Sequence, residues 1–429
     1  MENETRYSYK LVGVMEEDIK FLKYLPKDKL VDKRLEKAVK EAELILDYES
    51  AHNEELQQAL NIVRKFIQKK QRICYGGSAI NMLLPKNKRF YDPNVDLPDY
   101  DFFSPSIDKD VIELVGDLQK AGFKEVINRV GIHEGTKKIL VNFVAVADIS
   151  HLDKQLYNIY LKESHVIDGI HYTSPDMLRM MMYLELSRPR GEVTRWSKVY
   201  ERLELLNRYF PLRICKRVRT YPPVSTEVRK IIEDFIITHQ RILANIELEA
   251  VYKKSLHSKS INYSLEKGLK SVIVFFSPDI KKDAFDLKQL VDNSGLRILF
   301  IEEKGELIQN RIEIYQNSTL IALLISEAAC HSSSNIRTEN NRVLKIASLD
   351  TIINLYYTLH YFSNFKVSLC DIAQSIKTLR LLRVSKVSQF PAFAIECSGY
   401  QKGYPTLLRE KLLRIQKEKD KFKTLKKKK

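Results

Sequence analysis

Two pairs of residues in the first quarter of the chain have the types and spacing that phosphate chemistry needs. Asp99 and Asp101 lie in a short apolar run, and residues i and i+2 of a β-strand face the same side, so the two carboxylates would stand together. Gly77 and Ser78 follow an apolar stretch and precede a helix. Glycine lets the backbone approach a phosphate, and the amides at a helix N-terminus attract the anion. The sequence therefore predicts a site for a divalent ion and a phosphate.

This combination predicts metal-dependent nucleotidyl transfer. The reaction uses two divalent ions that bridge the triphosphate and the attacking hydroxyl, and Mg²⁺ prefers carboxylate and phosphate oxygens. A paired aspartate alone, or a Gly-Ser pair alone, is common, but the two in this order are more specific. The spacer between them is long, because residues 85–97 form an apparent insertion. Its Lys86, Lys88 and Arg89 could reach nucleic acid, although a solvated loop is the stronger interpretation.

A third carboxylate is expected on a neighbouring strand, and two residues of the strand-like stretch 139–149 are candidates. Asp148 has apolar neighbours, as a strand carboxylate should, whereas Asn142 carries an amide that replaces a metal-bridging carboxylate poorly. The two are six residues apart, which is about 20 Å along an extended strand, so they cannot share a site unless the chain bends. We select Asp148.

The predicted elements around these residues alternate between strands and helices. A helix is expected over 32–70, a strand over 72–75, a helix over 79–84, a strand over 100–103 and a helix over 106–122. Helices follow between 172 and 209, and another over 226–239. A second block of strands and helices begins near residue 271. Its Ser348-Leu-Asp350 resembles the earlier Ser174-Pro-Asp176, since each precedes an apolar helix, which hints at a duplicated domain without the catalytic residues.

Several basic residues follow the predicted site. Arg195, Lys198 and Arg202 can share one face of a helix, and with Arg188 they could clamp a triphosphate or an RNA backbone. A salt-bridged surface helix is an equal alternative, because Glu192 and Glu201 are close in sequence. The basic and aromatic cluster at 216–221 suits RNA binding, although a linker face is slightly favoured. Trp196 is expected in the core.

Composition describes an ordinary globular chain with a basic surplus. The net charge is +16, and residues 402–429 hold twelve Lys and Arg against three acids, a surplus of +9. A solvated or frayed tail is expected for the final run 426–429, while the +7 of the rest of the chain favours a polyanionic partner. No run long and apolar enough for a membrane span and no signal peptide is visible. The five cysteines, odd in number and widely spaced, predict buried free thiols and a reducing, intracellular environment.

Three stretches resemble one known family. Residues 73–81 (ICYGGSAIN), 98–105 (PDYDFFSP) and 146–150 (VADIS) are similar to the poly(A) polymerase catalytic subunits of large cytoplasmic DNA viruses, as are 185–191 and 195–202. The motifs cover about a third of the chain. The departures are the long spacer before Asp99, and Asn142, where some relatives have Asp. If position 142 were the third metal site, catalysis would be in doubt.

The resemblance implies an α+β fold with a nucleotidyltransferase catalytic domain and a second, degenerate nucleotidyltransferase-like domain. It implies ATP as substrate, an RNA 3′ end as acceptor and two Mg²⁺ or Mn²⁺ ions held by Asp99, Asp101 and Asp148, with Gly77, Ser78, Arg195 and Lys198 at the nucleotide. We expect a homodimer, or a heterodimer with a methyltransferase-like processivity subunit, in the host cytoplasm or the virion. The expected domains are a helical extension over 1–70 that packs on the catalytic domain, the catalytic domain over 71–225, the second domain over 226–400 and a basic tail over 401–429.

Two alternatives remain open at this point. One is a non-catalytic RNA-binding or scaffold protein on a decayed nucleotidyltransferase fold. The other is a different nucleotidyltransferase, either CCA-adding or oligoadenylate-forming, because the contacts that select the base cannot be located from the sequence.

Overall fold

The computed structural model describes residues 29–92, 96–98, 100–213, 215, 225–258, 261–263, 270–304, 308, 310–362 and 367–427. It divides into two compact units. The smaller unit contains Tyr91–Leu97 and the chain up to Gln58, including helix α2 (Lys29–Ala51) and the start of α3 (Glu54–Lys70). The larger unit, Ala59–Phe90 with Pro98–Lys429, contains both sheets and the predicted site. The helix expected over 32–70 is thus two helices, which separate at His52 and Asn53.

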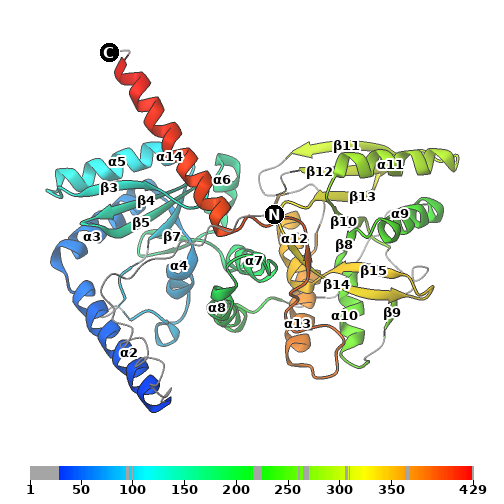
Figure 1. Cartoon of the computed structure of the whole chain (residues 1–429), viewed down its shortest axis with the longest axis horizontal. Coiled ribbons are helices and arrows are strands. Elements are labelled where there is room, and N and C mark those ends of the chain that lie inside the picture. The colour runs from blue at the N-terminus through cyan, green and yellow to red at the C-terminus, as the bar shows by residue number, and fades with distance from the viewer. Residues whose placement is uncertain are drawn as a thin grey trace, which may run out of the picture. The chain divides into compact units, whose positions relative to one another are not determined.

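The first sheet carries seven strands in the order β3-β4-β5-β2-β1-β7-β6 among the described residues (Figure 1). Its central strands are short and apolar, which lets helices cover them. The elements of this first repeat are β1 (Ile73–Cys74), α4 (Gly76–Leu83), η1 (Lys86–Lys88), β2 (Asp101–Ser104), α5 (Ile107–Lys120), β3 (Val126–Val130), β4 (Thr136–Val141), β5 (Val144–His151), α6 (Lys154–Glu163), β6 (His165–Ile167), β7 (Ile170–Tyr172), α7 (Pro175–Leu186), η2 (Val193–Arg195) and α8 (Trp196–Tyr209).

The second sheet repeats this order as β11-β12-β13-β10-β8-β15-β14, with β16 added beyond β14 and β9 paired to it. The elements of this second repeat are α9 (Thr226–Thr238), β8 (Ile242–Leu243), η3 (Ile246–Leu248), α10 (Glu249–Ser255), β9 (Asn262–Tyr263), β10 (Ile273–Ser277), α11 (Ile280–Asn293), β11 (Leu299–Lys304), β12 (Asn310–Gln316), β13 (Thr319–Ser326), β14 (His331–Thr338), β15 (Val343–Ala347), α12 (Leu349–Phe362), α13 (Leu369–Val384) and β16 (Cys397–Ser398).

Strand directions match as well as strand order. The first pair of each repeat is antiparallel (β1 with β2, β8 with β10), and the next is parallel (β2 with β5, β10 with β13). A further parallel pair joins β1 to β7 and β8 to β15. Such agreement in seven successive strands indicates a duplicated architecture, as the two similar helix starts suggested.

A buried ion pair marks the same place in both repeats. Arg72 precedes β1 and donates to both oxygens of Asp110, at 2.5 and 2.9 Å; Arg241 precedes β8 and binds Asp283 in the same way, at 2.7 and 2.8 Å. Each aspartate is the fourth residue of its helix. Because a bidentate arginine–carboxylate pair has strict geometry, it fixes the start of β1 against α5 and the start of β8 against α11.

The repeats align residue by residue through Ser104 and Ser277, the last residues of β2 and β10, which accept from the amides of Ser106 and Asp279. On this alignment Asp101 corresponds to Val274, whose neighbour on β13 is Leu323. The second repeat therefore has no carboxylates at these two positions, as the sequence suggested for its second block.

The two repeats contact each other through equivalent helices. Asn354 of α12 donates its amide to the backbone oxygen of Met180 on α7, at 2.9 Å. Tyr357 of α12 donates to Asp176 at 3.0 Å, and Asp176 also binds Arg179 of its own helix at 2.7 Å. Arg179 is 1% exposed, so this buried charge is paired. The helix pair holds the repeats together in the larger unit.

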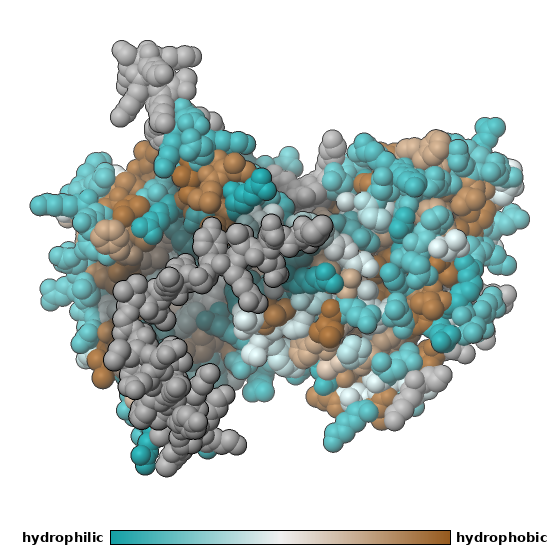
Figure 2. Space-filling model, in the orientation of Figure 1, coloured by the Kyte–Doolittle hydropathy of each residue, from teal (hydrophilic) through white to brown (hydrophobic). Residues whose placement is uncertain are grey.

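The basic C-terminal segment, expected as a tail over 401–429, is largely a helix. Helix α14 (Tyr404–Lys427) returns to the first repeat, where Arg414 donates to the backbone oxygens of Gly131 and Ile132 and Glu418 pairs with Lys137. Its outer side exposes Leu412 by 58% and carries further apolar residues; Figure 2 shows apolar side chains gathered along this helix. None of the helices in the described ranges is long and apolar enough to cross a membrane.

The cysteines also differ from expectation. Cys215 is bonded to Cys370 and Cys330 to Cys397, with Cα–Cα distances of 5.5 and 5.4 Å, while Cys74 is a buried free thiol. The prediction of free thiols is therefore wrong for four of the five, and these cysteines give no support to a reducing environment. Spacing along the chain could not reveal the pairs, because 155 and 67 residues separate their members.

Candidate active site

Asp101 and Asp148 lie on neighbouring strands of the first sheet. β2 and β5 run parallel, and the two aspartates are direct register partners. The amide of Asp148 donates to the backbone oxygen of Tyr100 at 3.0 Å, which fixes this register. Register partners on adjacent strands point to the same face, so the structure brings the two carboxylates together. Asp99 lies outside the described residues.

The Gly-Ser motif lies beside the same carboxylate. The amide of Tyr75 donates to the backbone oxygen of Asp101 at 2.9 Å, and α4 begins at the next residue. Gly76 has φ of +72°, and a β-carbon there would stand 2.8 Å from Asp101 Oδ2. Only glycine allows this approach without a shift of the carboxylate. Gly77 and Ser78 form the first turn of α4, and the amides at a helix N-terminus attract a phosphate.

Aromatic and hydroxyl side chains stabilise this face of the sheet. Tyr75 stacks on Phe103 with ring centroids 4.1 Å apart, and its hydroxyl hydrogen-bonds Ser150 Oγ at 2.8 Å. Ser150 is the register partner of Phe103, two residues beyond Asp148. Behind the face, burial and the charge of Asp101 raise the pKa of the Cys74 thiol, which stays protonated. The carboxylates thus lie on strands whose adjacent side chains, among them Phe102 and Ile149, are buried.

A lysine supplies positive charge to this carboxylate pair. Lys138 on β4 forms an ion pair with Asp148, its cross-strand partner. A divalent ion at Asp148 would compete with this ion pair for the carboxylate. The donor chemistry, two carboxylates beside a helix N-terminus, suits Mg²⁺ or Mn²⁺. Within the described ranges, which omit Asp99, no cluster of three or more His, Cys, Asp or Glu could hold a metal ion.

Asn142 lies in a hairpin turn, so the stretch 139–149 is two strands and the expectation of one is wrong. Asn142 and Phe143 connect β4 to β5 with φ of +48° and +66°, the left-handed pair that a two-residue hairpin needs. Asn317 and Ser318 do the same between β12 and β13, at +47° and +65°. Asparagine tolerates this conformation, which explains the residue type without a metal role.

The basic residues after α7 are in different environments. Arg195 is 54% exposed in its side chain and pairs with Glu185 at 3.5 Å and Glu192 at 3.4 Å. Lys198 is exposed on α8, and the Arg202 guanidinium lies 4.6 Å from the centre of the Phe90 ring. These contacts match the salt-bridged surface helix more closely than a phosphate clamp. The cluster 216–221 lies outside the described residues.

Trp196 is half-buried, with its indole nitrogen donating to the backbone oxygen of Glu185 at 3.2 Å and its ring 6.1 Å from Phe393. A packing role fits these contacts.

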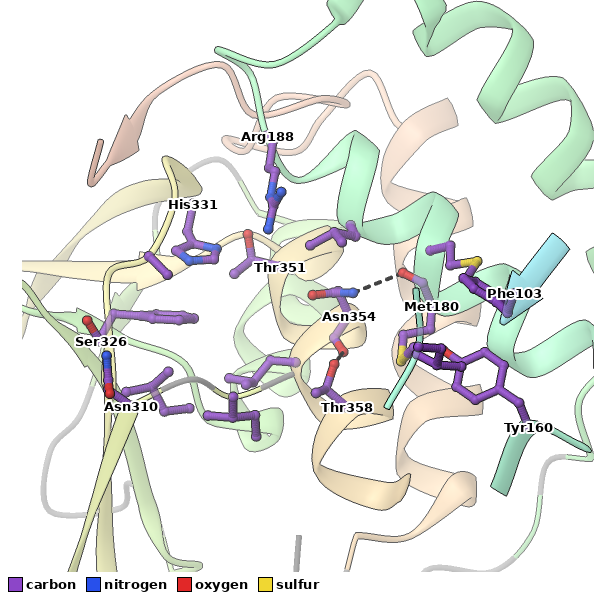
Figure 3. Close-up of a pocket in the computed structure, with 18 residues that line it drawn as sticks. Phe103, Tyr160, Met180, Arg188, Asn310, Ser326, His331, Thr351, Asn354 and Thr358 are labelled. Atoms are coloured by element: carbon purple, nitrogen blue, oxygen red, sulfur yellow. Dashed lines mark hydrogen bonds between the residues drawn. The ribbon is translucent and has the colours of Figure 1, made fainter. Parts of the chain in front are cut away.

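A cavity of about 430 Å³ lies between the two repeats (Figure 3). Its wall includes Phe103, two residues beyond Asp101 on β2, and Arg188, just after α7. The second repeat contributes His331, Thr351 and others. Sequence patterns did not single out His331, and the motif before Thr351 indicated only the start of a helix. Only the contact between the repeats makes these residues neighbours of the first repeat.

The sequence similarity to known proteins is found mainly in the first repeat. A family model described as "Poly(A) polymerase catalytic subunit" matches residues 61–192. Putative poly(A) polymerase catalytic subunits are similar to this chain in African swine fever virus (isolate Tick/Malawi/Lil 20-1/1983; 31% identity over 189 residues, 43% of this chain and 39% of that protein) and in Acanthamoeba polyphaga mimivirus (30% over 178 residues, 40% and 30%). The chain thus matches about two fifths of the African swine fever virus protein's length.

The fold is shared over a much longer region. The crystal structure of the Megavirus polyadenylate synthase superposes on 98% of this chain and 86% of its own with a TM-score of 0.72, at 18% sequence identity. The mixed α/β, nucleotidyltransferase-like fold expected from the sequence is thereby confirmed. The chain therefore resembles the poly(A) polymerase catalytic subunits of large DNA viruses in its first repeat, and it has the fold of a viral polyadenylate synthase over almost its whole length.

Proposed function

We propose that this protein is a template-independent poly(A) polymerase that adds AMP from ATP to RNA 3′ ends. The observation that carries the proposal is the register pairing of Asp101 with Asp148 beside Gly76, inside the segment that matches the family model. Two adjacent carboxylates next to a helix N-terminus can hold divalent ions and a triphosphate at one place. The proposal extends to the protein the activity named for its relatives.

Each site residue has a proposed role. Asp99, Asp101 and Asp148 hold two Mg²⁺ or Mn²⁺ ions, and the amides of Gly77 and Ser78 bind the triphosphate. When bound, such ions neutralise the phosphates and lower the pKa of the attacking 3′ hydroxyl. The register pairing of Asp101 with Asp148 and the stacking of Tyr75 on Phe103 support these roles, because a preorganised site needs little rearrangement on substrate binding.

Arg195 and Lys198 are proposed as outer contacts to the nucleotide or the RNA. For Arg195 this would require exchanging its bonds to Glu185 and Glu192 for phosphate oxygens.

The non-catalytic alternative is less well supported. A decayed site loses its metal carboxylates first, and the second repeat illustrates this with Val274 and Leu323 at the two equivalent positions. The first repeat keeps Asp101, Asp148 and the close glycine. CCA-adding and oligoadenylate-forming activities remain as alternatives, because they use the same nucleotidyl-transfer reaction. The nucleoside triphosphate that the protein incorporates would distinguish them.

The proposed partners are an RNA 3′ end, ATP, and a second copy of this chain or a methyltransferase-like processivity subunit. The basic surplus of +16 favours a polyanionic partner. The host cytoplasm or the virion is the proposed location. The domain boundaries remain as proposed from the sequence, at residues 70, 225 and 400.

One incubation tests the proposal. The full chain is mixed with Mg²⁺ or Mn²⁺, a short RNA and each nucleoside triphosphate separately, and extension is followed on a gel. Extension with ATP alone is expected; extension with CTP would favour a CCA-adding enzyme, and no extension the non-catalytic alternative. Asp101→Asn should abolish AMP incorporation while RNA binding stays near wild type, because a carboxylate charge is lost without a change of shape. Unchanged incorporation in this variant would contradict the assignment.

A further inference from the structure

Four charged side chains form one row across the first sheet. Strand register pairs Asp101 of β2 with Asp148 of β5. Asp148 is in turn paired with Lys138 of β4, and Lys138 with Arg129 of β3. Register partners on adjacent strands point to the same face, so all four side chains stand on the face that carries the candidate active site. Figure 1 shows β5, β4 and β3 side by side, and along them the row passes from two carboxylates directly to two cations.

The two cations are exposed, whereas the opposite face of the sheet is covered. The side chains that alternate with the row, Phe102, Ile139 and Ile149, are 0% exposed, and α5 contacts β3, β4 and β5. Because a helix packs on the apolar face of a sheet, α5 lies on the side opposite the row. Lys138 and Arg129 are both exposed. Their charges therefore face solvent beside the carboxylate pair.

The start of helix α4 and the two cations lie on opposite sides of the carboxylates. α4 begins directly after β1, and a β-carbon on Gly76 would stand 2.8 Å from Asp101 Oδ2. The sheet order β3-β4-β5-β2-β1 puts Asp101 nearer to that helix and Asp148 nearer to Lys138. Adjacent strands are about 4.8 Å apart, so the backbone of Lys138 lies about 5 Å beyond Asp148 and that of Arg129 about 10 Å beyond it. The row thus leads away from the place proposed for the triphosphate.

Nucleotidyl transfer needs its two substrates on opposite sides of the reacting phosphorus. The attacking 3′ oxygen approaches in line with the leaving pyrophosphate, from the far side. With the triphosphate at the start of α4, the acceptor RNA reaches the carboxylates from the β5 side, where it meets Lys138 and then Arg129. The phosphates of this RNA must lie close to two aspartates that repel them. Two cations at this position offset that repulsion.

We propose that Lys138 and Arg129 bind the last two phosphodiesters of the acceptor RNA, with Lys138 at the one nearer the 3′ end. The inference rests on the proposed function, because it takes Asp101 and Asp148 as the place where the 3′ hydroxyl reacts. Lys138 is held in position by its ion pair with Asp148. A carboxylate engaged with a divalent ion would release this ammonium to a phosphate oxygen, which is an equivalent anionic acceptor.

The test determines which phosphate each cation contacts. Full-length wild type, the two row variants Lys138→Gln and Arg129→Gln, and the control Lys109→Gln are titrated against 5′-labelled oligo(A) in Mg²⁺ without ATP, and binding is followed by fluorescence anisotropy. Lys109 is exposed on α5, which covers the opposite face of the sheet. The RNA is used unmodified, or with one neutral methylphosphonate linkage at the last, the penultimate or a central phosphodiester.

Neutralising one phosphodiester should have an effect that depends on its partner. Wild type should bind RNA with a neutral last linkage about three- to tenfold more weakly. Lys138→Gln should lose a similar factor on unmodified RNA and nothing more when the last linkage is neutral, because the two changes remove opposite ends of one contact. Arg129→Gln should behave in this way with the penultimate linkage. Lys109→Gln should stay within about twofold of wild type on every RNA.

The salt dependence gives a second measurement. The plot of log affinity against log salt concentration should be shallower by about 0.7 in each row variant, because one phosphate contact of a single strand is lost. Lys109→Gln should keep the wild-type slope. ATP affinity, measured by calorimetry, should stay within about twofold of wild type in both row variants.

Three results would overturn the inference. The first is unmodified RNA bound by both row variants as tightly as by wild type. The second is a neutral last linkage that weakens binding to Lys138→Gln as much as binding to wild type. The third is a loss of ATP affinity as large as the loss of RNA affinity, which would assign the two cations to the triphosphate.

Failure of the inference and failure of the proposed function are separable. A wild type that binds the RNA end through Lys138 yet incorporates no nucleotide would keep the row as an RNA site and remove the polymerase. A wild type that incorporates AMP while both row variants bind RNA normally would do the reverse.

Discussion

Asp101 and Asp148 are register partners on adjacent parallel strands, although 47 residues separate them in sequence. The parallel pairing needs a crossover, which α5 and the β3–β4 hairpin provide. The third carboxylate of the predicted site is therefore placed by the sheet and not by a local motif. This pairing is what distinguishes Asp148 from Asn142.

Asp148→Asn should abolish catalysis while leaving the fold intact. The amide cannot replace a carboxylate that holds a divalent ion, so we expect AMP incorporation to fall on the order of a thousandfold. Asn142→Gly is the matched control, because glycine accepts the positive φ of the hairpin turn and should stay within about twofold of wild type. Primer extension with ATP measures both. A loss confined to the Asn142 variant would move the third metal position to the turn.

Gly76→Ala should damage the site through a steric contact. The new methyl would stand 2.8 Å from Asp101 Oδ2 at a positive φ, so the carboxylate must move and the backbone is strained by about 1–2 kcal/mol. We expect incorporation to fall about tenfold or more. Gly116→Ala on α5 is the control, because nothing lies within 4 Å of its added carbon and alanine should stabilise the helix by about 0.5–1 kcal/mol. Equal activity of the two variants would exclude the close approach.

Glu233 should make the folded state less stable as the pH rises. The side chain is 5% exposed on α9, its Oε1 has no hydrogen-bond partner, and burial raises its pKa to about 7. Between the ordinary value of 4.5 and 7 the folded state binds more protons than the unfolded state, so the free energy of unfolding falls with pH across this window.

Glu233→Gln removes the titrating group and should flatten this part of the pH profile. The gain in stability should be on the order of 2 kcal/mol at pH 8 and close to zero at pH 4. Urea unfolding midpoints of both proteins from pH 4 to 8 measure it. Parallel profiles would show that Glu233 does not carry the raised pKa.

Elements that depend on residues close together in the sequence are predicted correctly, whereas features that depend on distant residues are not. Features that depend on neighbouring residues are predictable from the sequence: the helix expected over 106–122 is α5, and the capped helix after Ser174 is α7. The stretch 139–149 is two strands and not the one strand expected, because the two-residue turn at Asn142 and Phe143 hardly interrupts its apolar pattern. Helix α14 was expected as a tail because its high charge hides the contacts of Arg414 and Lys137 that hold it.

The sequence by itself determined which chemistry to propose: the residue types and spacing around Gly77, Ser78, Asp99 and Asp101 predict a metal and phosphate site, and a strand's two-residue period would place the two carboxylates on one face. Only the tertiary structure decided that Asp148 joins Asp101, that Arg188 and His331 line one cavity, and that the second repeat supplies more than half of the residues lining it. The physical reason is that register and helix packing depend on contacts between residues far apart in the chain. A local sequence pattern does not specify which distant strand or helix a segment will pack against.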